Sequence, residues 1–503
     1  MASTGDMPAT TAAGIDDRSP SPVISQTRWT KFVSLVWDSD YYIKSPAERR
    51  LVFKLDCMIL SVVCLGWFMK YLDQANLANA YVSGMKEDLN ILGNEYTYMQ
   101  TVYNIAYAVL QVPSNLIILK VRPSWWLGMC EFGWMAFTFA QAGARNSNDM
   151  YAFRALVGLF EAAFQPVSLF LLASWYTGPE LAKRTAFRMV SGIFGSAISG
   201  YLQAAIYVTL DGVAGFAGWR WLYIICGLMT FPSAVLTLFV LPDFPHNSKS
   251  RWLTEEERQL AIDRCARAGI AQIGGKLDVR LVKRIFGSWR IYLISITYLI
   301  YATSVQDVNY MAIWLGGNGV SVVLRNVWFA GTKLIAIPCF LFYGWLTDRL
   351  GNRFYVCFTV MVWALVPCGI LAVHPKNFNL MTFAWFMTDT FVITPILFPW
   401  FNEICKANAE ERAIVISTAN LVFYIFNAWL PVVVFPQVEA PRFMKGFWTS
   451  FGMIVGTLFL LVALNFMHSR QKRLTQLAPE EEVTMESVDK EKEGFTDVNV
   501  VPK

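Results

Sequence analysis

Residues 154–166 read RALVGLFEAAFQP, and they lie inside a mostly apolar run that extends from about residue 150 to about residue 175. An α-helix rises 1.5 Å per residue, so a helix over this run is long enough to cross the roughly 30 Å hydrocarbon core of a membrane. The run therefore predicts a membrane-spanning helix that carries two charged side chains, Arg154 and Glu161, into the bilayer.

Similar apolar runs recur along most of the chain. Of its 503 residues, 55% are hydrophobic and only 16% are charged, and the mean hydropathy is +0.40. A soluble globular protein carries about 25% charged residues. This deficit argues against a large soluble protein and predicts an all-α polytopic membrane protein.

The runs predict twelve transmembrane helices, at about residues 55–80, 96–119, 124–143, 150–175, 184–208, 218–241, 289–314, 326–346, 353–373, 380–403, 412–436 and 446–468. A polar, charged segment at 242–288 separates the first six from the last six, and its stretch LTEEERQLAIDRC predicts a surface helix that begins after Thr254. We therefore expect an N-terminal tail (1–54), a six-helix half (55–241), a central loop (242–288), a second six-helix half (289–468) and an acidic tail (469–503).

Positive charge indicates the orientation of these helices. Lys and Arg are frequent in the loops after predicted helices 2, 4, 6, 8 and 12, with Lys183, Arg184 and Arg188 around the start of helix 5, and they are sparse in the opposite loops. The positive-inside rule then places both termini and the central loop in the cytoplasm. The net charge of +5 is modest, and no basic-aromatic stripe suggests a nucleic-acid partner.

A few ionisable residues fall inside the predicted spans. The ones that we single out are Lys70, Asp73, Arg154, Glu161, Asp307, Lys333 and Asp389. A charged side chain at a helix centre costs about 2.5–3.5 kcal/mol on insertion scales, and such residues usually serve a function. Each one should therefore have a partner and a role.

Arg154 and Glu161 share one face of their helix, because seven residues make about 700° of rotation, but they are about 10.5 Å apart along its axis. Each must therefore find a partner elsewhere, and Asp73 of the first helix is a candidate partner for Arg154. Such a pair is either a buried lock between helices or part of a proton and substrate site. A carboxyl group that gains and loses a cationic partner can take up and release a proton.

Two further charges have open interpretations. Lys333 falls near the middle of the eighth helix, where it either binds a carboxylate ligand or extends its amine towards the membrane surface. Asp307 lies near the outer end of the seventh helix, close to the glycines of NYMAIWLGGNG, and is either part of an outer gate or a helix cap.

The stretch GWLTDRLGNR, residues 344–353, follows the eighth predicted helix. It resembles the signature G-x-L-x-D-R-x-G-x-R of the major facilitator superfamily, whose fold has two six-helix halves with the substrate between them. The resemblance implies an inner gate formed by Gly344, Asp348, Arg349, Gly351 and Arg353.

The stretch YLDQANLANAYVSGMKEDL, residues 71–89, together with QVPSNLIILKVRPSWWL and RALVGLFEAAFQP, resembles the fungal anion:cation symporter (allantoate permease) family, and within it the pantothenate and biotin carriers. The resemblance implies that Asp73 and Glu161 carry protons, that Arg154 pairs with an acid or with the substrate, and that Asn76 lines the site. Many relatives have a basic residue where this chain has Gln74. That difference either moves the anion contact to Arg154 or Lys333 or changes the class of substrate.

Three functions compete. The first is a proton symporter that imports a small organic anion or vitamin across the plasma membrane, working as a monomer without cofactor or metal. The second is an exporter of a secondary metabolite or drug, which the absence of proline from SGIFGSAISG disfavours. The third, a nutrient receptor, lacks long signalling tails. The sequence shows no metalloprotease motif, nucleophile elbow or histidine cluster, so we expect no enzyme.

Overall fold

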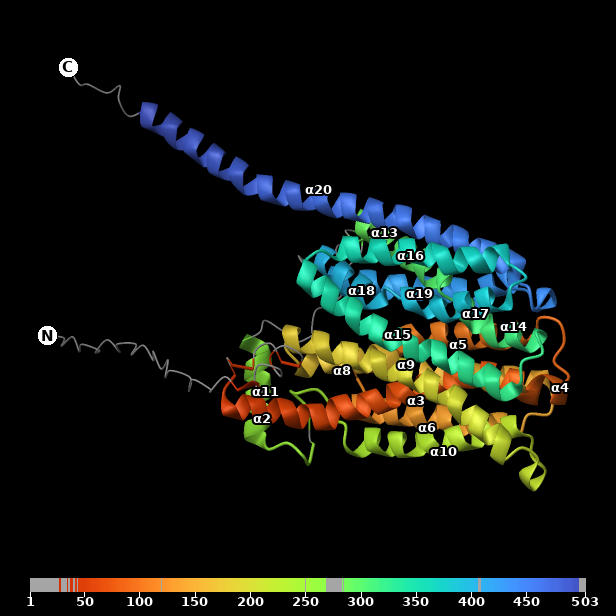
Figure 1. Ribbon diagram of the computed structural model, residues 1–503. Coiled ribbons are helices and arrows are strands. Elements are labelled where there is room, and N and C mark those ends of the chain that lie inside the picture. Colours follow the sequence, from red (N-terminus) through yellow and green to blue (C-terminus); the bar gives the residue numbers. More distant parts are fainter. Residues whose placement is uncertain are drawn as a thin grey trace, which may run out of the picture.

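The computed structural model describes residues 27–28, 34, 37–38, 41–42, 44–118, 120–248, 250–267, 283, 285–405 and 409–496. In this described part of the chain, all regular elements are helices. They run roughly alongside one another as two stacked groups, one formed by α2–α10 and the other by α13–α20 (Figure 1).

The first group contains the N-terminal helices. A first rod is formed by α2 (Pro46–Leu55), η1 (Asp56–Leu60), α3 (Ser61–Ala80), η2 (Tyr81–Met85) and α4 (Lys86–Asp88). It is followed by α5 (Glu95–Ile117), α6 (Pro123–Gln141), α7 (Ser147–Glu161), α8 (Phe164–Trp175), α9 (Gly178–Thr209), η3 (Val213–Gly215) and α10 (Gly218–Phe239).

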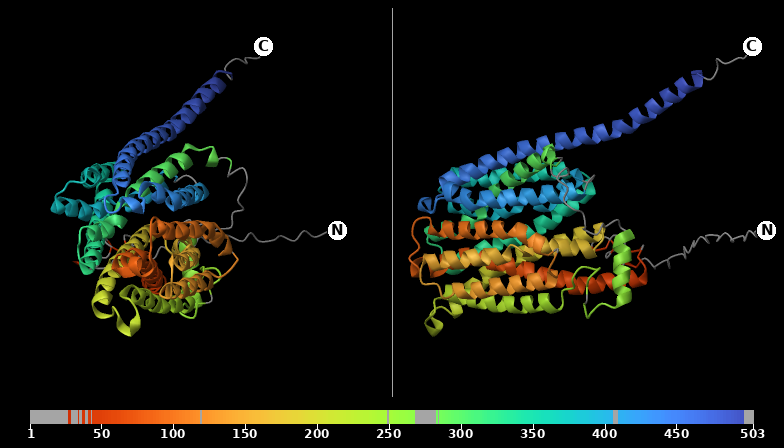
Figure 2. Two further views of the ribbon diagram at one scale, coloured as in Figure 1. Left: turned by 90° about the vertical axis from the view of Figure 1, so that its right-hand side faces the viewer. Right: turned by 180° about the vertical axis from the view of Figure 1, so that it is seen from behind.

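The second group follows α11 (Glu255–Arg267). It consists of α13 (Trp289–Ser304), η4 (Asp307–Tyr310), α14 (Met311–Gly317), α15 (Val322–Leu350), α16 (Arg353–Val373), α17 (Phe378–Met387), η5 (Thr388–Phe391), α18 (Thr394–Ile404), α19 (Ala409–Val434), η6 (Gln437–Glu439) and α20 (Met444–Thr496). Beyond the bundle, α20 continues as a single helix on the side where both termini lie (Figures 1 and 2).

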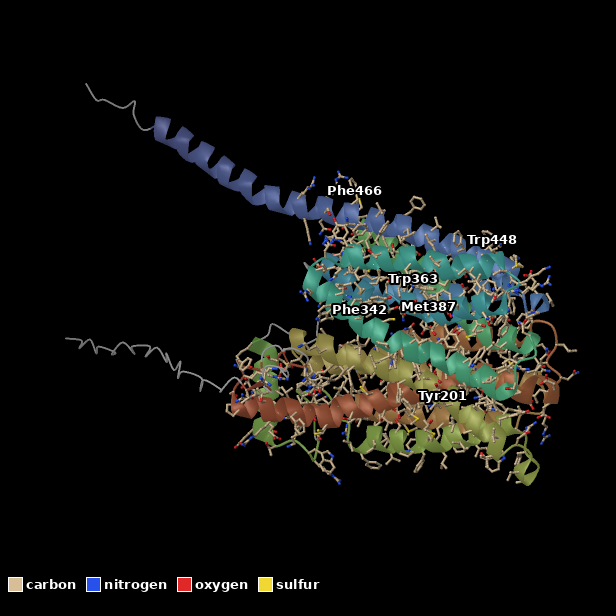
Figure 3. All side chains as sticks on the ribbon, viewed as in Figure 1. Tyr201, Phe342, Trp363, Met387, Trp448 and Phe466 are labelled. Carbon is tan, nitrogen blue, oxygen red and sulfur yellow. The ribbon has the colours of Figure 1, made fainter. Side chains whose placement is uncertain are left out.

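Each of the twelve predicted transmembrane helices has a counterpart among these elements. By length and composition, nine helices of the described residues can cross a membrane. The other three counterparts are α5, α6 and α13, and α13 has only 16 residues because the chain leaves the helix before η4. Large apolar side chains such as Phe342, Trp448 and Phe466 are exposed on the outside of the bundle, as a lipid-facing surface requires (Figure 3).

Three of the rods break at a carboxylate residue. The hydrogen bonding between α7 and α8 is interrupted directly after Glu161, while the backbone of Ala162 and Ala163 stays helical. η4 begins at Asp307 and separates α13 from α14, and Asp389 lies in η5 between α17 and α18. Membrane transporters tolerate such breaks where the backbone lines a binding site. The chain thus combines helix interruptions with its buried acids.

The two groups contact each other at the end opposite the termini. There Arg325 donates to the carbonyl of Val82 (3.3 Å), Asn326 donates to Ser83 Oγ (3.0 Å), and the N–H of Gln437 donates to Asn94 (2.8 Å). The acceptors Val82 and Ser83 belong to η2, where Ser83 and Gly84 depart from helical backbone angles. This kink presents backbone and hydroxyl groups to the other half.

At the opposite end, α11 contacts the N-terminal group through ion pairs. Lys54 pairs with Glu257 (2.6 Å), and Arg264 pairs with Glu180 (3.0 Å). The predicted surface helix of the central loop is therefore present, and it is attached to the first half.

Candidate functional site

Glu161 lies at the end of α7, completely buried. Pro166 near the start of α8 has no N–H to donate to a carbonyl one turn earlier, which favours the break that follows Glu161. One turn before, Gly158 lets α5 approach: a Cβ at this position would lie 2.5 Å from the backbone oxygen of Tyr103. The glycine thereby brings Tyr103 beside Glu161.

The carboxylate of Glu161 accepts hydrogen bonds from uncharged side chains. The hydroxyl of Tyr103 donates to Glu161 Oε2 at 2.6 Å, and Gln74 Nε2 donates to the same oxygen at 3.2 Å. Gln74 also donates to the Tyr103 hydroxyl at 2.5 Å. Oε1 of Glu161 is buried and accepts no hydrogen bond among the described residues, and the carboxyl group of Asp73 is an electrostatic neighbour of Glu161. Gln74, the departure noted in the sequence, is thus a direct ligand of the central acid.

Asp73 is held in a different way. It accepts from Thr138 Oγ1 at 2.7 Å and from Asn76 Nδ2 at 3.1 Å. Asn76 is itself fully buried and accepts from Ser199 Oγ at 2.8 Å. Asn76 therefore connects α3 to α9 and contacts Asp73, and its place in the substrate site stays a prediction.

Arg154 is buried, and its guanidinium carbon lies 4.6 Å from the centre of the Tyr103 ring. Its Nε and Nη1 atoms have no hydrogen-bond partner among the described residues. The stacking on Tyr103 places Arg154 against the same tyrosine that binds Glu161.

Lys70, one turn before Asp73, completes what we call the central cluster: Lys70, Asp73, Gln74, Tyr103, Arg154 and Glu161. Its amine donates to the Tyr107 hydroxyl at 2.9 Å and lies 4.4 Å from the centre of that ring. The Tyr107 ring in turn packs against Tyr424 of α19, with 4.4 Å between the ring centres. A tyrosine pair therefore connects the cluster to the other half.

The structure does not bring every candidate to this cluster. Lys333 forms an ion pair with Asp389 at 3.0 Å, within the C-terminal half. Asp307 is buried there too, and accepts from Ser450 at 2.5 Å and from Cys368 Sγ at 3.7 Å. Both residues have partners within the C-terminal half. The binding of a carboxylate ligand by Lys333 and the role of Asp307 in an outer gate therefore stay predictions.

A small cavity with both polar and apolar side chains in its wall lies between the halves. Its lining includes Gln100 of α5, Thr303 and Gln306 near the end of α13, Asn309 of η4, Asn427 of α19 and Ser450 of α20. Because Ser450 also binds Asp307, that acid lies just behind the cavity wall.

The GWLTDRLGNR stretch lies at the end of the bundle near the termini. Gly351 ends α15 in the left-handed conformation at φ 62°, which glycine adopts without strain. Arg353 donates to Glu403 at 3.2 Å, and Lys472 pairs with the same carboxylate at 3.0 Å. Arg349 lies over the Trp345 ring, whereas the side chain of Asp348 lies outside the described residues.

The family profile of the Major Facilitator Superfamily matches residues 63–431, which cover most of the helical bundle. The chain belongs to the Major Facilitator Superfamily. Its fold and its membership therefore confirm the sequence prediction, and the chain is a multi-pass membrane transporter rather than an enzyme.

Individual relatives are fungal transporters. The chain is 34% identical to the MFS transporter PfmaC of Pestalotiopsis fici, over 80% of this chain and 76% of that protein. It is 30% identical to the pantothenate transporter liz1 of Schizosaccharomyces pombe, over 87% and 85%. It is also 30% identical to a vitamin H transporter of Saccharomyces cerevisiae, over 89% and 76%. The predicted resemblance to pantothenate and vitamin carriers is thus confirmed.

Among solved structures, the chain matches a D-xylose-proton symporter with a TM-score of 0.61 and 14% identity, over 81% of this chain and 97% of that one. It matches a bacterial homologue of the human lysosomal transporter Spinster with a TM-score of 0.56 and 14% identity, over 82% and 96%. At this identity the match concerns the fold alone.

Sequence reasoning missed two buried cations. It assigned Arg184 and Arg188 to the cytoplasmic loop charges at the start of helix 5, but α9 begins at Gly178 and both side chains are fully buried. The signal was available in principle. Arg188 and Gly192 are four residues apart and so share the helix face that packs on α3.

Proposed function

We propose that this transporter is a proton-coupled symporter that imports a small organic anion of the pantothenate type by alternating access. It would work as a monomer in the plasma membrane with both termini in the cytoplasm. The observation that carries the proposal is Glu161, a fully buried carboxyl group whose hydrogen-bond partners are Tyr103 and Gln74 rather than a fixed cation.

Such a group is suited to carrying a proton. A buried carboxyl group without a permanent ion pair changes its protonation when its surroundings change. Lys70 is an electrostatic neighbour of Glu161, yet its amine is bonded to Tyr107. Because Tyr107 packs against Tyr424 of the opposite half, relative movement of the halves would change the position of Lys70 and thereby the charge near Glu161.

The same geometry supports alternating access. The hydrogen bonds of Val82, Ser83 and Asn94 with the second half close the end opposite the termini. In the proposed cycle these contacts break when the transporter opens to the outside. A solute and a proton then reach the central cluster, and the halves close behind them.

The relatives support the class of substrate. Two pantothenate transporters, at 30% and 28% identity, and a vitamin H transporter align with this chain over at least 86% of its length. Pantothenate and biotin are both monocarboxylates, which suits a cluster that contains buried cations. Growth rescue of a transporter-deficient yeast with pantothenate, biotin, nicotinate or allantoate would identify the solute, and an efflux assay with preloaded cells would detect export.

The Glu161→Gln variant tests whether transport is coupled to a proton through Glu161. The variant is expected to lose uphill uptake while it retains exchange of labelled for unlabelled solute, because exchange returns the protein with solute bound and needs no net proton movement. Wild-type uptake should rise at acid external pH. Coupling through Glu161 would be refuted if the variant still showed full uphill uptake. It would also be refuted if uptake by wild type did not depend on pH at a clamped membrane potential.

A further inference from the structure

Arg188 of α9 is a completely buried cation outside the central cluster as defined above. Its guanidinium carbon lies 3.9 Å from the centre of the Trp67 ring. All three of its side-chain nitrogens are buried and have no hydrogen-bond partner among the described residues. An unpaired buried charge costs several kcal/mol, so its presence calls for a ligand.

Arg184, one turn earlier on the same helix, shows what a structural arginine looks like here. It is equally buried, but its Nε and Nη2 atoms donate to the two oxygens of Asp56 at 2.7 and 2.8 Å. Arg184 therefore joins α9 to the first rod. Arg188 has the same donors and no such carboxylate.

Packing holds Arg188 in place. Ser191 Oγ donates to the carbonyl of Cys64 at 3.1 Å, and a Cβ on Gly192 would lie 2.7 Å from Trp67 Nε1. Close contact of α9 with α3 thus fixes the guanidinium on the indole. Trp67 Nε1 is a second buried donor without a partner, so two unpaired donors lie side by side.

Buried groups of both signs lie in this region. Lys70, Arg154 and Arg188 are three buried cations, and Asp73, Glu161 and Glu131 are three buried carboxyl groups, each no more than 3% exposed. Arg188 forms no hydrogen bond with any of these carboxyl groups among the described residues, so its own charge is left without a partner.

We propose that Arg188, with Trp67 Nε1 beside it, binds the carboxylate of the transported solute. This assignment rests on the proposed import of an organic anion and specifies a carboxylate as the group of the solute that is bound. A guanidinium binds a carboxylate through two parallel hydrogen bonds, which makes it selective for this group. It also supplies the cation that Gln74 does not provide on α3.

Access requires movement of the halves. In the conformation described here Arg188 is sealed, and Tyr71 and Tyr107 are its electrostatic neighbours. Tyr107 packs against Tyr424 of the second half. Separation of these two rings is the movement that would let a carboxylate reach the guanidinium.

The test compares pantothenate with panthenol, its neutral alcohol analogue, in proteoliposomes that contain wild type or Arg188→Gln. Loss of one partner of a buried charge pair costs about 2–5 kcal/mol, so the KM for pantothenate should rise by about 30-fold or more. Transport of panthenol should change little. The ratio of kcat/KM for pantothenate to kcat/KM for panthenol should therefore fall towards one. Arg184→Gln is the matched control: it should reduce the amount of folded protein but keep the preference.

The outcomes separate the two proposals. If wild type transports none of the vitamins, the proposed function fails. If wild type prefers pantothenate and Arg188→Gln keeps both its KM and its preference, the Arg188 assignment is wrong. Should Arg188→Gln not fold, Arg188→Lys decides, because it keeps the charge and loses the paired geometry: a KM unchanged from wild type would overturn the assignment, and a rise of about tenfold would support it.

Discussion

Gly158→Ala is the most direct test of how the central acid is positioned. The glycine lies on α7 where α5 crosses it, and a Cβ there would lie 2.5 Å from the backbone oxygen of Tyr103 and 3.0 Å from Cδ2 of its ring. A backbone atom cannot rotate away as a flexible side chain does. The two helices would have to separate by about 1 Å to reach ordinary contact.

That separation has two measurable consequences. Forcing an extra methyl group into a packed interior costs about 1–3 kcal/mol of stability. It would also pull the Tyr103 hydroxyl away from Glu161, a bond of 2.6 Å in the structure. Misplacement of a catalytic or binding group by 1 Å can cost about 100-fold in rate. We therefore expect transport by this variant to fall by roughly 10- to 100-fold.

Gly452→Ala provides the matched control, because a Cβ at this α20 position would meet nothing within 4 Å. Both variants are purified, their thermal unfolding is measured, and their initial uptake rates are compared at equal amounts of reconstituted protein. Gly452→Ala should behave as wild type or be slightly more stable, since alanine favours a helix. If the two variants have the same uptake rate and the same melting temperature, the proposed role of the close approach is wrong.

Two other predictions concern single contacts. Tyr103→Phe removes the hydroxyl donor to Glu161, and hydrogen bonds to charged groups contribute about 1.5–3 kcal/mol, so transport should fall by about 10- to 100-fold while protein yield stays near that of wild type; unchanged uptake would contradict this. Partial burial of Glu257 raises its pKa, but the hydrogen bonds from Lys54 and from the Thr254 N–H lower it by more. The pKa of Glu257 therefore lies below its ordinary value. Its contribution to the docking of α11 is therefore present above the ordinary pKa of about 4.3 and lost as pH falls through the lower folded-state value. Limited proteolysis of α11 should accelerate at that acid pH in wild type. In Glu257→Gln it should be fast already at neutral pH. Identical pH profiles for the two proteins would show that the Lys54–Glu257 ion pair does not attach α11 to the first half.

The sequence predicted the architecture well because lipid imposes a simple rule on it. Apolar runs long enough to span a bilayer identify helices whatever their partners are, and twelve such runs correspond to the helical rods of the structure. The predicted span at 150–175 is present as one continuous run of α7 and α8, but the interruption of its hydrogen bonding after Glu161 was not predicted, because the same apolar composition continues into α8. Its cause is local: Pro166 removes a backbone donor.

The clustering of the candidate residues was predicted only in part. Gln74 and Glu161 come together because both contact Tyr103, and Asp73 is an electrostatic neighbour of Glu161. The depth of a residue in the membrane can be estimated from the sequence, but it does not show that Lys333 pairs with Asp389. That pairing depends on which faces of the two helices meet.

The kink at η2 has an energetic consequence for this transporter. Its polar contacts with the second half are hydrogen bonds, and each contributes only about 0.5–1.5 kcal/mol net because water can replace it. A two-state protein whose conformations differ by a few kcal/mol populates both. In the proposed alternating-access cycle, binding of one solute molecule then supplies enough differential affinity to reverse which state predominates. Replacing these polar contacts with a large apolar interface would favour one conformation so strongly that turnover would stop.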